Sequence, residues 1–336
     1  MLQTGKKKLS TVRDVAELSL LSPATVSRVF DLKWEGKIKE STREKVIEAA
    51  KSLGYTPNAI ARSLLTNRTN IVAVVVGVQV GYFYSDVFFK LLQRIQNSGK
   101  QVLVFSADPD KSVESIVSQV HQYRIDAMLI MANATSTYIE NYFVEYGTPV
   151  ILFDRVSHAD GISYVGSDNF FGARMAADFL IENNLRSIAY ISGDKNPSQA
   201  LGRSECFIKQ VKDRGGQIIE QIDGDFTYQC GYQTMQQLMK NKHLNAVFCA
   251  DDTMAMGAID AARASGLCVP ADISIMGFDN NSVAGLLAYD LTTISHQLDL
   301  LLDTLIELLE SVMANPHTER ILLPMELKVR SSVKLA

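Results

Sequence analysis

The chain has 336 residues, of which 47% are hydrophobic and 21% are charged, the composition of a globular protein long enough for two or three domains. Its formal net charge of −4 would by itself argue against a nucleic-acid partner. However, residues 1–68 carry 13 Lys and Arg against 7 Asp and Glu, which leaves 20 against 30 for the rest. A basic first segment on an acidic remainder indicates a protein that contacts phosphates at one end only.

Neither a membrane nor an oxidising compartment is indicated. The longest apolar run, 71–78, is far shorter than the roughly 18 residues that a spanning helix needs. The lysines at 6–8 precede no apolar segment of a signal peptide. The four cysteines form no CxxC pair, which argues against a zinc site or a disulfide framework. We therefore expect a cytoplasmic protein with free thiols.

The first organised stretch has two short amphipathic segments separated by a tight turn, a pattern typical of a helix-turn-helix. The first segment places on one face Val12, Val15, Ala16 and Leu18. The second begins with Ser22 and Pro23, a hydroxyl cap followed by a proline at a position where its missing N–H is harmless.

The second segment is predicted to point a small apolar set inward, namely Val26, Val29 and Phe30. Its outward face then consists of Pro23, Ala24, Ser27 and Arg28. We expect Arg28 to recognise a base, because a guanidinium can donate two hydrogen bonds to guanine, a contact that discriminates by roughly 1–3 kcal/mol. The small apolar residues suit a thymine methyl, and Thr25 and Ser27 can reach phosphates. A solvated helix surface is the alternative.

A third helix is predicted over 42–53, with Gly54 as its C-terminal cap. Its inward residues would be Val46, Ile47, Ala50 and Leu53. The preceding loop, 31–39, carries three lysines around Trp34, the only tryptophan. This loop either follows a phosphate backbone or is simply solvated.

A hinge follows at 57–68, where Pro57 breaks the chain and Asn58 can cap a helix of about eight residues. Because isolated helices shorter than roughly 12–15 residues are marginal in water, this helix needs a partner.

From residue 69 the pattern changes to short apolar runs alternating with amphipathic segments, which predicts parallel sheets covered by helices. The predicted strands are 71–76, 101–105, 127–130, 150–153, 187–191, 218–222, 246–249 and 273–277. The predicted helices include 85–97, 170–182, 228–240, 253–264 and 297–313. The series divides near Tyr164 into two similar halves, with the chain crossing back near 290–325. The predicted domains are thus 1–56, 57–68 and 69–336.

Ligands of such sheets bind beyond the carboxyl ends of the strands. Polar and aromatic residues gather at these predicted ends, at 79–84, 154–155, 251–252 and 279–280. Carboxylates and amides can pair with sugar hydroxyls, while an aromatic ring covers the apolar side of a sugar. A carbohydrate cleft is therefore expected, although an Asp in this place, such as Asp168 or Asp252, can instead cap the next helix.

The motifs ATVSRVF, STREKV and LGYTPNAIARSL, together with later body motifs, resemble those of the lactose/galactose repressor (LacI/GalR) family over essentially the whole chain. The resemblance implies an all-α helix-turn-helix head and an α/β body like a periplasmic binding protein, with two doubly wound parallel-sheet lobes. It further implies a homodimeric transcriptional regulator, most often a repressor, that binds a pseudo-palindromic operator and responds to a small molecule. Two departures are Leu20, where relatives have a turn glycine, and a loop at 31–39 about two residues longer than in the lactose repressor.

The resemblance also implies roles for single residues. The DNA-contacting set would be Thr11, Ser22, Pro23, Ala24, Thr25, Ser27 and Arg28 in the head, with Asn58, Ala61 and Leu64 in the hinge. Leu64 would act as an apolar wedge in the minor groove, unless it packs on the body instead.

In the body, Arg203 in NPSQALGRSECF and Asp279 in SIMGFDNN match ligand-contacting positions of the family. The full effector-binding set would be Tyr82, Phe83, Asp154, Arg203, Phe226, Asp251, Asp279 and His296. Alternatives are that Phe226 belongs to the core, that Phe83 lies at a subunit contact, and that His296 is structural. The effector would be a sugar or sugar derivative, with a purine-type corepressor as the alternative.

An enzyme is not indicated. The chain contains no GxGxxG after a predicted strand, no GxxxxGK[ST], no GxSxG and no HExxH. Its five histidines are scattered and have no metal-ligand spacing. We therefore expect no cofactor, no metal and no catalytic residues. A free-standing sugar-binding protein also fits poorly, since it would need an export signal and no basic head.

Overall fold

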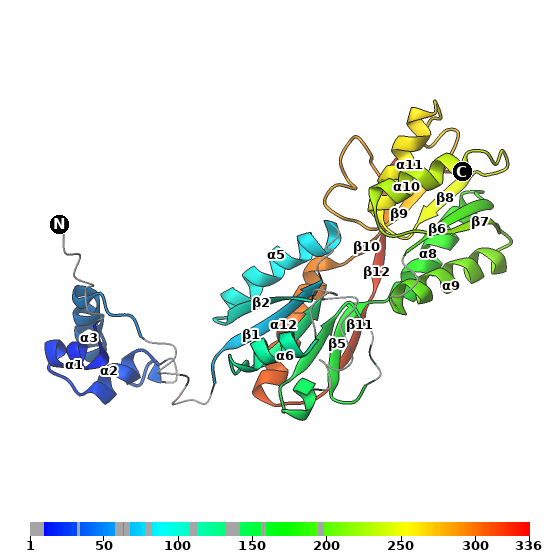
Figure 1. Ribbon diagram of the computed structural model, residues 1–336. Helices are drawn as coiled ribbons and strands as arrows, with labels where there is room; N and C mark the ends of the chain where they lie inside the picture. Colours follow the sequence, from blue (N-terminus) through cyan, green and yellow to red (C-terminus); the bar gives the residue numbers. More distant parts are fainter. Residues whose placement is uncertain are drawn as a thin grey trace, which may run out of the picture. The chain divides into compact units, whose positions relative to one another are not determined.

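The computed structural model describes residues 10–31, 34–57, 63, 68–77, 82–107, 113–131, 142–155, 157, 159–193 and 198–336. The chain forms two compact units, Met1–Thr69 and Asn70–Ala336. The first unit is helical and the second is an α/β body with two sheets (Figure 1).

The head contains α1 (Val12–Ser19), α2 (Pro23–Val29) and α3 (Glu40–Leu53). Its small core is formed by Val15, Ala16, Val26, Val29, Val46, Ala49 and Ala50. Two residues predicted to point inward are exposed instead, Leu18 by 53% and Ile47 by 44%. Those two predictions were wrong because the apolar face of each helix is wider than the part of it that contacts the other two helices of so small a bundle.

The turn between α1 and α2 is closed by Leu20 in the left-handed conformation, with φ 56° and ψ 38°. Its backbone N–H donates to the carbonyl oxygens of Ala16 and Glu17, which caps α1. A leucine is strained there by roughly 1–2 kcal/mol relative to a glycine, because its Cβ crowds the backbone. Since the side chain of Leu20 is 91% exposed, packing does not compensate for this strain.

The first lobe of the body has a sheet in the order β11-β5-β4-β3-β1-β2, with every neighbouring pair parallel. Its strands are β1 (Ile71–Gly77), β2 (Gln101–Ala107), β3 (Ala127–Met131), β4 (Val150–Phe153), β5 (Ile162–Ser167) and β11 (Arg320–Leu323). The helices are α5 (Tyr82–Asn97), α6 (Val113–His121) and α12 (Leu298–Ala314). Helices α5 and α12 pack on one face of the sheet and α6 on the other (Figure 1).

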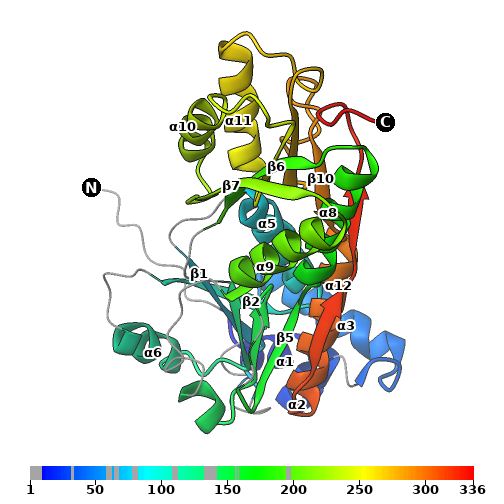
Figure 2. The same ribbon diagram turned by 90° about the vertical axis from the view of Figure 1, so that its right-hand side faces the viewer.

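The second lobe has a sheet in the order β12-β10-β9-β8-β6-β7, parallel except for the β10 and β12 pair. Its strands are β6 (Ser187–Ser192), β7 (Gln217–Asp223), β8 (Ala246–Cys249), β9 (Ser274–Asp279), β10 (Thr292–His296) and β12 (Met325–Lys328). The helices are α8 (Asn169–Glu182), α9 (Ser198–Asp213), α10 (Tyr228–Leu238) and α11 (Asp252–Ala264). Helices α8 and α9 lie side by side, as do α10 and α11, and the two pairs flank the sheet (Figure 2).

The chain passes between the lobes at three places, between β5 and α8, between β10 and α12, and between β11 and β12. The predicted fold class is confirmed. The eight predicted strands agree with the structure within two residues, whereas β5, β10, β11 and β12 were not predicted. Among the described residues, no helix is both long and apolar enough to cross a membrane.

Candidate functional site

The outward face of α2 is the candidate surface of the head. Its exposed residues are Pro23, Ala24, Ser27 and Arg28, as predicted, while Val26 and Val29 are buried. The guanidinium carbon of Arg28 lies 4.6 Å from the ring centre of Trp34. This face offers one cation, one hydroxyl and small apolar contacts, a combination that suits the major groove.

Two predicted DNA contacts of the head, Thr11 and Ser22, also cap its helices. Thr11 and Asp14 form a reciprocal capping box at the start of α1. At the start of α2, the Ser22 Oγ accepts from the Thr25 backbone N–H at 3.1 Å and lies 2.9 Å from the Thr25 Oγ1. Asn58, Ala61 and Leu64 of the predicted hinge lie outside the described residues. Their roles stay predictions.

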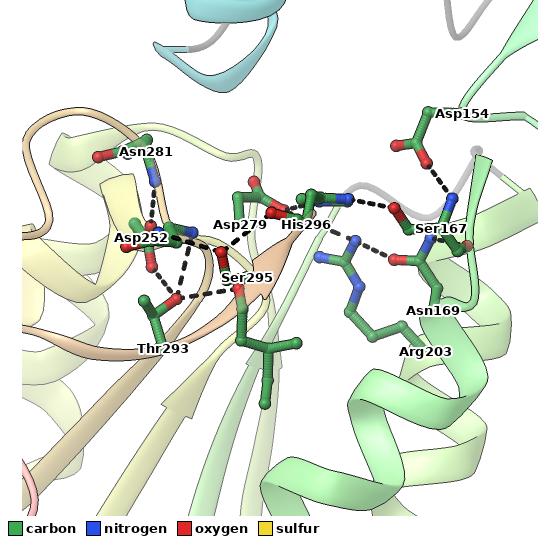
Figure 3. Close-up of polar contacts among 12 residues, drawn as sticks. Asp154, Ser167, Asn169, Arg203, Asp252, Asp279, Asn281, Thr293, Ser295 and His296 are labelled. Atoms are coloured by element: carbon green, nitrogen blue, oxygen red, sulfur yellow. Dashed lines mark hydrogen bonds and ion pairs between the residues drawn. The ribbon is translucent and has the colours of Figure 1, made fainter. Parts of the chain in front are cut away.

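In the body, a continuous polar chain runs through His296, at the end of β10, where the chain leaves the second lobe (Figure 3). The His296 Nδ1 lies 2.7 Å from the Ser167 Oγ, and its Nε2 lies 3.2 Å from the Asp279 Oδ1. Its ring stacks on Phe83 of α5 at a centroid distance of 4.2 Å. Since Ser167 and Phe83 belong to the first lobe and Asp279 to the second, the imidazole connects both.

Arg203 of α9 is buried, with only 8% of its surface exposed. Its guanidinium donates to the Ala250 carbonyl oxygen and, at 2.5 Å, to the Asn169 Oδ1. It lies 3.6 Å over the Phe278 ring centre and 3.9 Å from the Asp279 carboxylate. Within the described residues, its buried Nε has no hydrogen-bond partner, the kind of donor that a ligand can satisfy.

Three of the predicted effector residues have an unusual backbone. Asp154, Phe226 and Asp279 have φ values of 50°, 63° and 104°, a region that L-residues rarely adopt. Such conformations concentrate at binding sites, where the fold holds side chains in place against local strain. Asp154, just after β4, also accepts from the Ser167 backbone N–H at 3.2 Å, and its burial raises the pKa of its carboxyl group.

Asp251, just after β8, is buried and caps α11 by accepting from the Met254 backbone N–H at 2.9 Å. Burial, followed by the nearby charge of Asp279, raises the pKa of Asp251 to about 7. Asp252 is fully buried and accepts from the Asn281 backbone N–H at 2.8 Å and from the Thr293 hydroxyl at 2.6 Å. Asp252 therefore connects the start of α11 to β10 and to the loop after β9, a structural role.

A cavity of about 280 Å³ lies between α5 and the loop after β9. It is lined by Phe83, Asp86, Lys90, Asp279, Asn280, Asn281, Ser282, His296 and Leu298. The Ser282 backbone N–H donates to the Asp86 carboxylate at 2.9 Å, which links the lobes across this cavity. A larger hollow of about 430 Å³ near His121 and Tyr146 includes no predicted site residue.

The structure thus gathers Phe83, Asp154, Arg203, Asp279 and His296 along the junction of the lobes. Tyr82 is 53% exposed and does not line the cavity. The Phe226 ring lies where a Cβ on Gly193 would stand, at the end of β6.

Sequence reasoning missed Ser167, Asn169, Asp86 and Lys90. Ser167 ends β5 and Asn169 begins α8, and because the sequence pattern did not predict β5, the search of strand ends passed over both. Asp168 between them caps α8 through the Phe171 backbone N–H at 2.9 Å, the alternative considered for it. No group of three potential metal ligands occurs in the described part of the chain.

Comparison with known families gives two matches. Residues 11–58 match the bacterial regulatory proteins of the lacI family, and residues 177–333 match the periplasmic binding protein-like domain. The chain is 31% identical over 318 residues to the HTH-type transcriptional repressor PurR of Klebsiella pneumoniae (strain 342), covering 93% of this chain and 92% of that protein. The repressor of the same name in Escherichia fergusonii is also 31% identical, over 317 residues with the same coverage.

Two solved structures are similar over nearly the whole chain. The lac repressor dimer bound to operator and the anti-inducer ONPF has a TM-score of 0.84 and 26% identity, covering 98% of this chain and 100% of that one. The complex of the transcriptional regulator CelR with cellobiose has a TM-score of 0.71 and 27% identity, covering 96% and 99%.

Proposed function

This chain belongs to the lacI family of bacterial regulatory proteins and is therefore a DNA-binding transcriptional regulator. We propose that a sugar or sugar derivative bound between the two lobes of its body controls its affinity for an operator. The relatives that it matches are repressors, not enzymes. A cytoplasmic location follows for a protein that acts on a bacterial operator.

The head supplies the DNA contacts. The exposed face of α2 would lie in the major groove, with Arg28 on a guanine edge and with Thr25 and the helix caps Thr11 and Ser22 near phosphates. Two heads of a homodimer would read the two halves of a pseudo-palindrome. The hinge would complete the contact, with Leu64 inserted between base steps.

The body supplies the effector site. The observation that carries this proposal is the meeting of Phe83 from one lobe with Asp279 from the other at His296, beside a cavity. Carboxylate, imidazole and guanidinium groups next to an aromatic ring can pair with sugar hydroxyls and cover a sugar's apolar side. One of the similar solved regulators supports this ligand class, since the complex of CelR contains cellobiose.

Control would work through a difference in affinity between two body conformations. An effector that favours one arrangement of the lobes by about 1–3 kcal/mol changes the operator affinity by roughly 5- to 150-fold. Since a hinge helix of eight residues is marginal alone, its ordering can respond to so small an energy.

A planar nucleobase is the second candidate, because Phe83 and Phe226 are aromatic rings at or near the strand ends. A thermal-shift screen against sugars, sugar phosphates and nucleobases separates the two classes, since a ligand that binds only the folded state raises the melting temperature. Stabilisation by nucleobases alone would replace the sugar proposal. If the protein enriches no sequence from a pool of random DNA duplexes, the proposal that it binds a specific operator is overturned.

A further inference from the structure

Trp34, in the long loop before α3, lies beside the side chain expected to recognise a base. The guanidinium carbon of Arg28 is 4.6 Å from the ring centre of Trp34, and the Lys37 ammonium is 5.9 Å from it. Both cations are within the roughly 6 Å over which an aromatic face attracts positive charge. Arg28 is exposed and Trp34 is half-buried.

Backbone hydrogen bonds hold the loop in this position. The Asp31 N–H donates to the Arg28 carbonyl at 3.2 Å, and the Trp34 N–H donates to the Asp31 carbonyl at 2.9 Å. The Lys37 N–H then donates to the Trp34 carbonyl at 3.1 Å, in a turn that Gly36 permits with its φ of 72°. These hydrogen bonds connect the backbone of Trp34 to the end of α2. They therefore fix the position of the Trp34 ring relative to Arg28.

The core of the head does not explain this tryptophan. Among the described residues, the core of the head is formed by residues of α1, α2 and α3 together with four residues outside these helices, Leu21, Phe30, Ile38 and Tyr55. Trp34 is not part of this core. The cations of Arg28 and Lys37 lie over its ring instead, and Arg28 belongs to the outward face of α2.

The indole ring attracts the guanidinium of Arg28 without accepting a hydrogen bond from any of its five N–H groups, which remain available to donate. Among the described residues, none of the ion pairs involves Arg28. An unsupported arginine loses rotamer freedom when it binds, and a side chain ordered beforehand loses less. Building on the proposed function, we propose that Trp34 is a specificity-determining residue that positions Arg28 to recognise one base pair.

The test uses the full-length protein and DNA that it selects. Wild-type protein is first used to enrich a sequence from a pool of random DNA duplexes. Fluorescence anisotropy then measures binding to that sequence and to each single-base variant. Trp34→Leu should reduce discrimination by about two- to five-fold, the size expected of an exposed cation–π contact. The loss should fall at the base pair where Arg28→Ala removes the preference, and binding to non-specific DNA should not change.

Three further variants separate positioning from a general effect. Trp34→Phe should restore most of the discrimination, because a phenyl ring can still stack on the guanidinium. In an Arg28→Ala background, Trp34→Leu should have no further effect at that base pair. Ile47→Ala, which removes an exposed apolar side chain from α3, should leave all base preferences as in the wild type.

The outcomes distinguish this inference from the proposed function. If wild-type protein enriches a sequence but Trp34→Leu discriminates as well as wild type, or weakens binding to all DNA equally, the positioning role is overturned. If no sequence is enriched, the proposed function fails first. Because the chain has a single tryptophan, its emission also reports the stack directly. Arg28→Ala should shift the emission of the DNA-free protein to longer wavelength, and an unchanged spectrum would contradict the contact.

Discussion

The imidazole of His296 lies against the phenyl ring of Phe83, with centroids 4.2 Å apart and planes 26° from parallel. The two residues belong to different parts of the fold, His296 to the end of β10 and Phe83 to the first turn of α5. Any rearrangement of the lobes that displaces the end of β10 must therefore alter a contact with the helix that covers the first sheet.

His296→Leu tests this coupling. Leucine keeps much of the buried volume but cannot bond to Ser167 or Asp279. Because two hydrogen bonds of roughly 1 kcal/mol each are lost, we expect the effector concentration for a half-maximal response to rise at least tenfold. Operator binding without effector should stay within about threefold of wild type. Anisotropy titrations on the selected operator measure both, and an unchanged effector response would exclude His296 from the coupling.

Asp279→Ala should abolish the effector response while operator binding remains measurable. The carboxylate contacts His296 at 3.2 Å and the Arg203 guanidinium at 3.9 Å, so its loss leaves a buried cation without its nearest negative charge. The matched control is Asp299→Ala, which removes an exposed carboxylate paired with Arg94. A normal response in the Asp279 variant would move the effector site elsewhere.

Asp251→Asn should make the stability of the body less dependent on pH. Since the folded pKa of about 7 lies above the unfolded value of about 3.9, the folded protein retains a proton that the unfolded chain releases. The contribution of this residue to the free energy of unfolding therefore falls as pH rises from about 4 to about 7, by up to about 4 kcal/mol. Above pH 7 it stays at the lower level.

Asparagine cannot ionise but still offers an oxygen to the Met254 N–H. The variant should consequently melt at a higher temperature than wild type at pH 8 and at a similar temperature at pH 4.5. Scanning calorimetry at the two pH values measures the difference. An equal change in melting temperature at both would show that Asp251 does not titrate in this range.

Leu20→Gly should stabilise the head by about 0.5–1 kcal/mol. Glycine removes the strain of the left-handed conformation at φ 56°, and part of that gain is lost to the greater freedom of the unfolded chain. Leu20→Ala keeps a Cβ and should give no such gain. Thermal unfolding of the head, followed by the emission of Trp34, compares the three proteins.

Leu64→Ala should weaken binding to the selected operator more than binding to non-specific DNA. The reason is that a wedge between base steps contributes only where the duplex bends to admit it. Anisotropy with both kinds of duplex provides the comparison. Equal losses on both would remove the wedge from the proposal.

Some strands were predictable from sequence and others were not, as β1 and β10 illustrate. β1, with the sequence IVAVVVG, is identifiable because nearly every side chain in it is apolar. β10, with the sequence TTISH, is just as buried, but its polar groups are satisfied by distant partners. Thr292 bonds to the Arg330 carbonyl and Thr293 to Asp252. Such tertiary partners leave no periodic signal in the sequence.

The candidate site shows the same division. Asp154, Asp251 and Asp279 were found because they follow strands that the pattern had identified. Ser167 ends β5 and Asn169 lies two residues further on, and both were missed because the β5 sequence ISYVGS is too mixed to predict a strand. Contacts between the lobes, such as that of Asp86 with Ser282, depend on how the two lobes meet. The periodicity of the sequence cannot predict them.

Because the chain crosses between the lobes three times, it also determines the order in which the lobes can fold during synthesis. During synthesis, the first sheet lacks its edge strand β11 and its covering helix α12 until residue 323 has emerged. The second sheet waits for β12, which ends at Lys328. Neither lobe can therefore complete its sheet on the ribosome before the last strands, β11 and β12, have emerged. Until then the nascent protein exposes apolar surface, which makes it a natural client for chaperones.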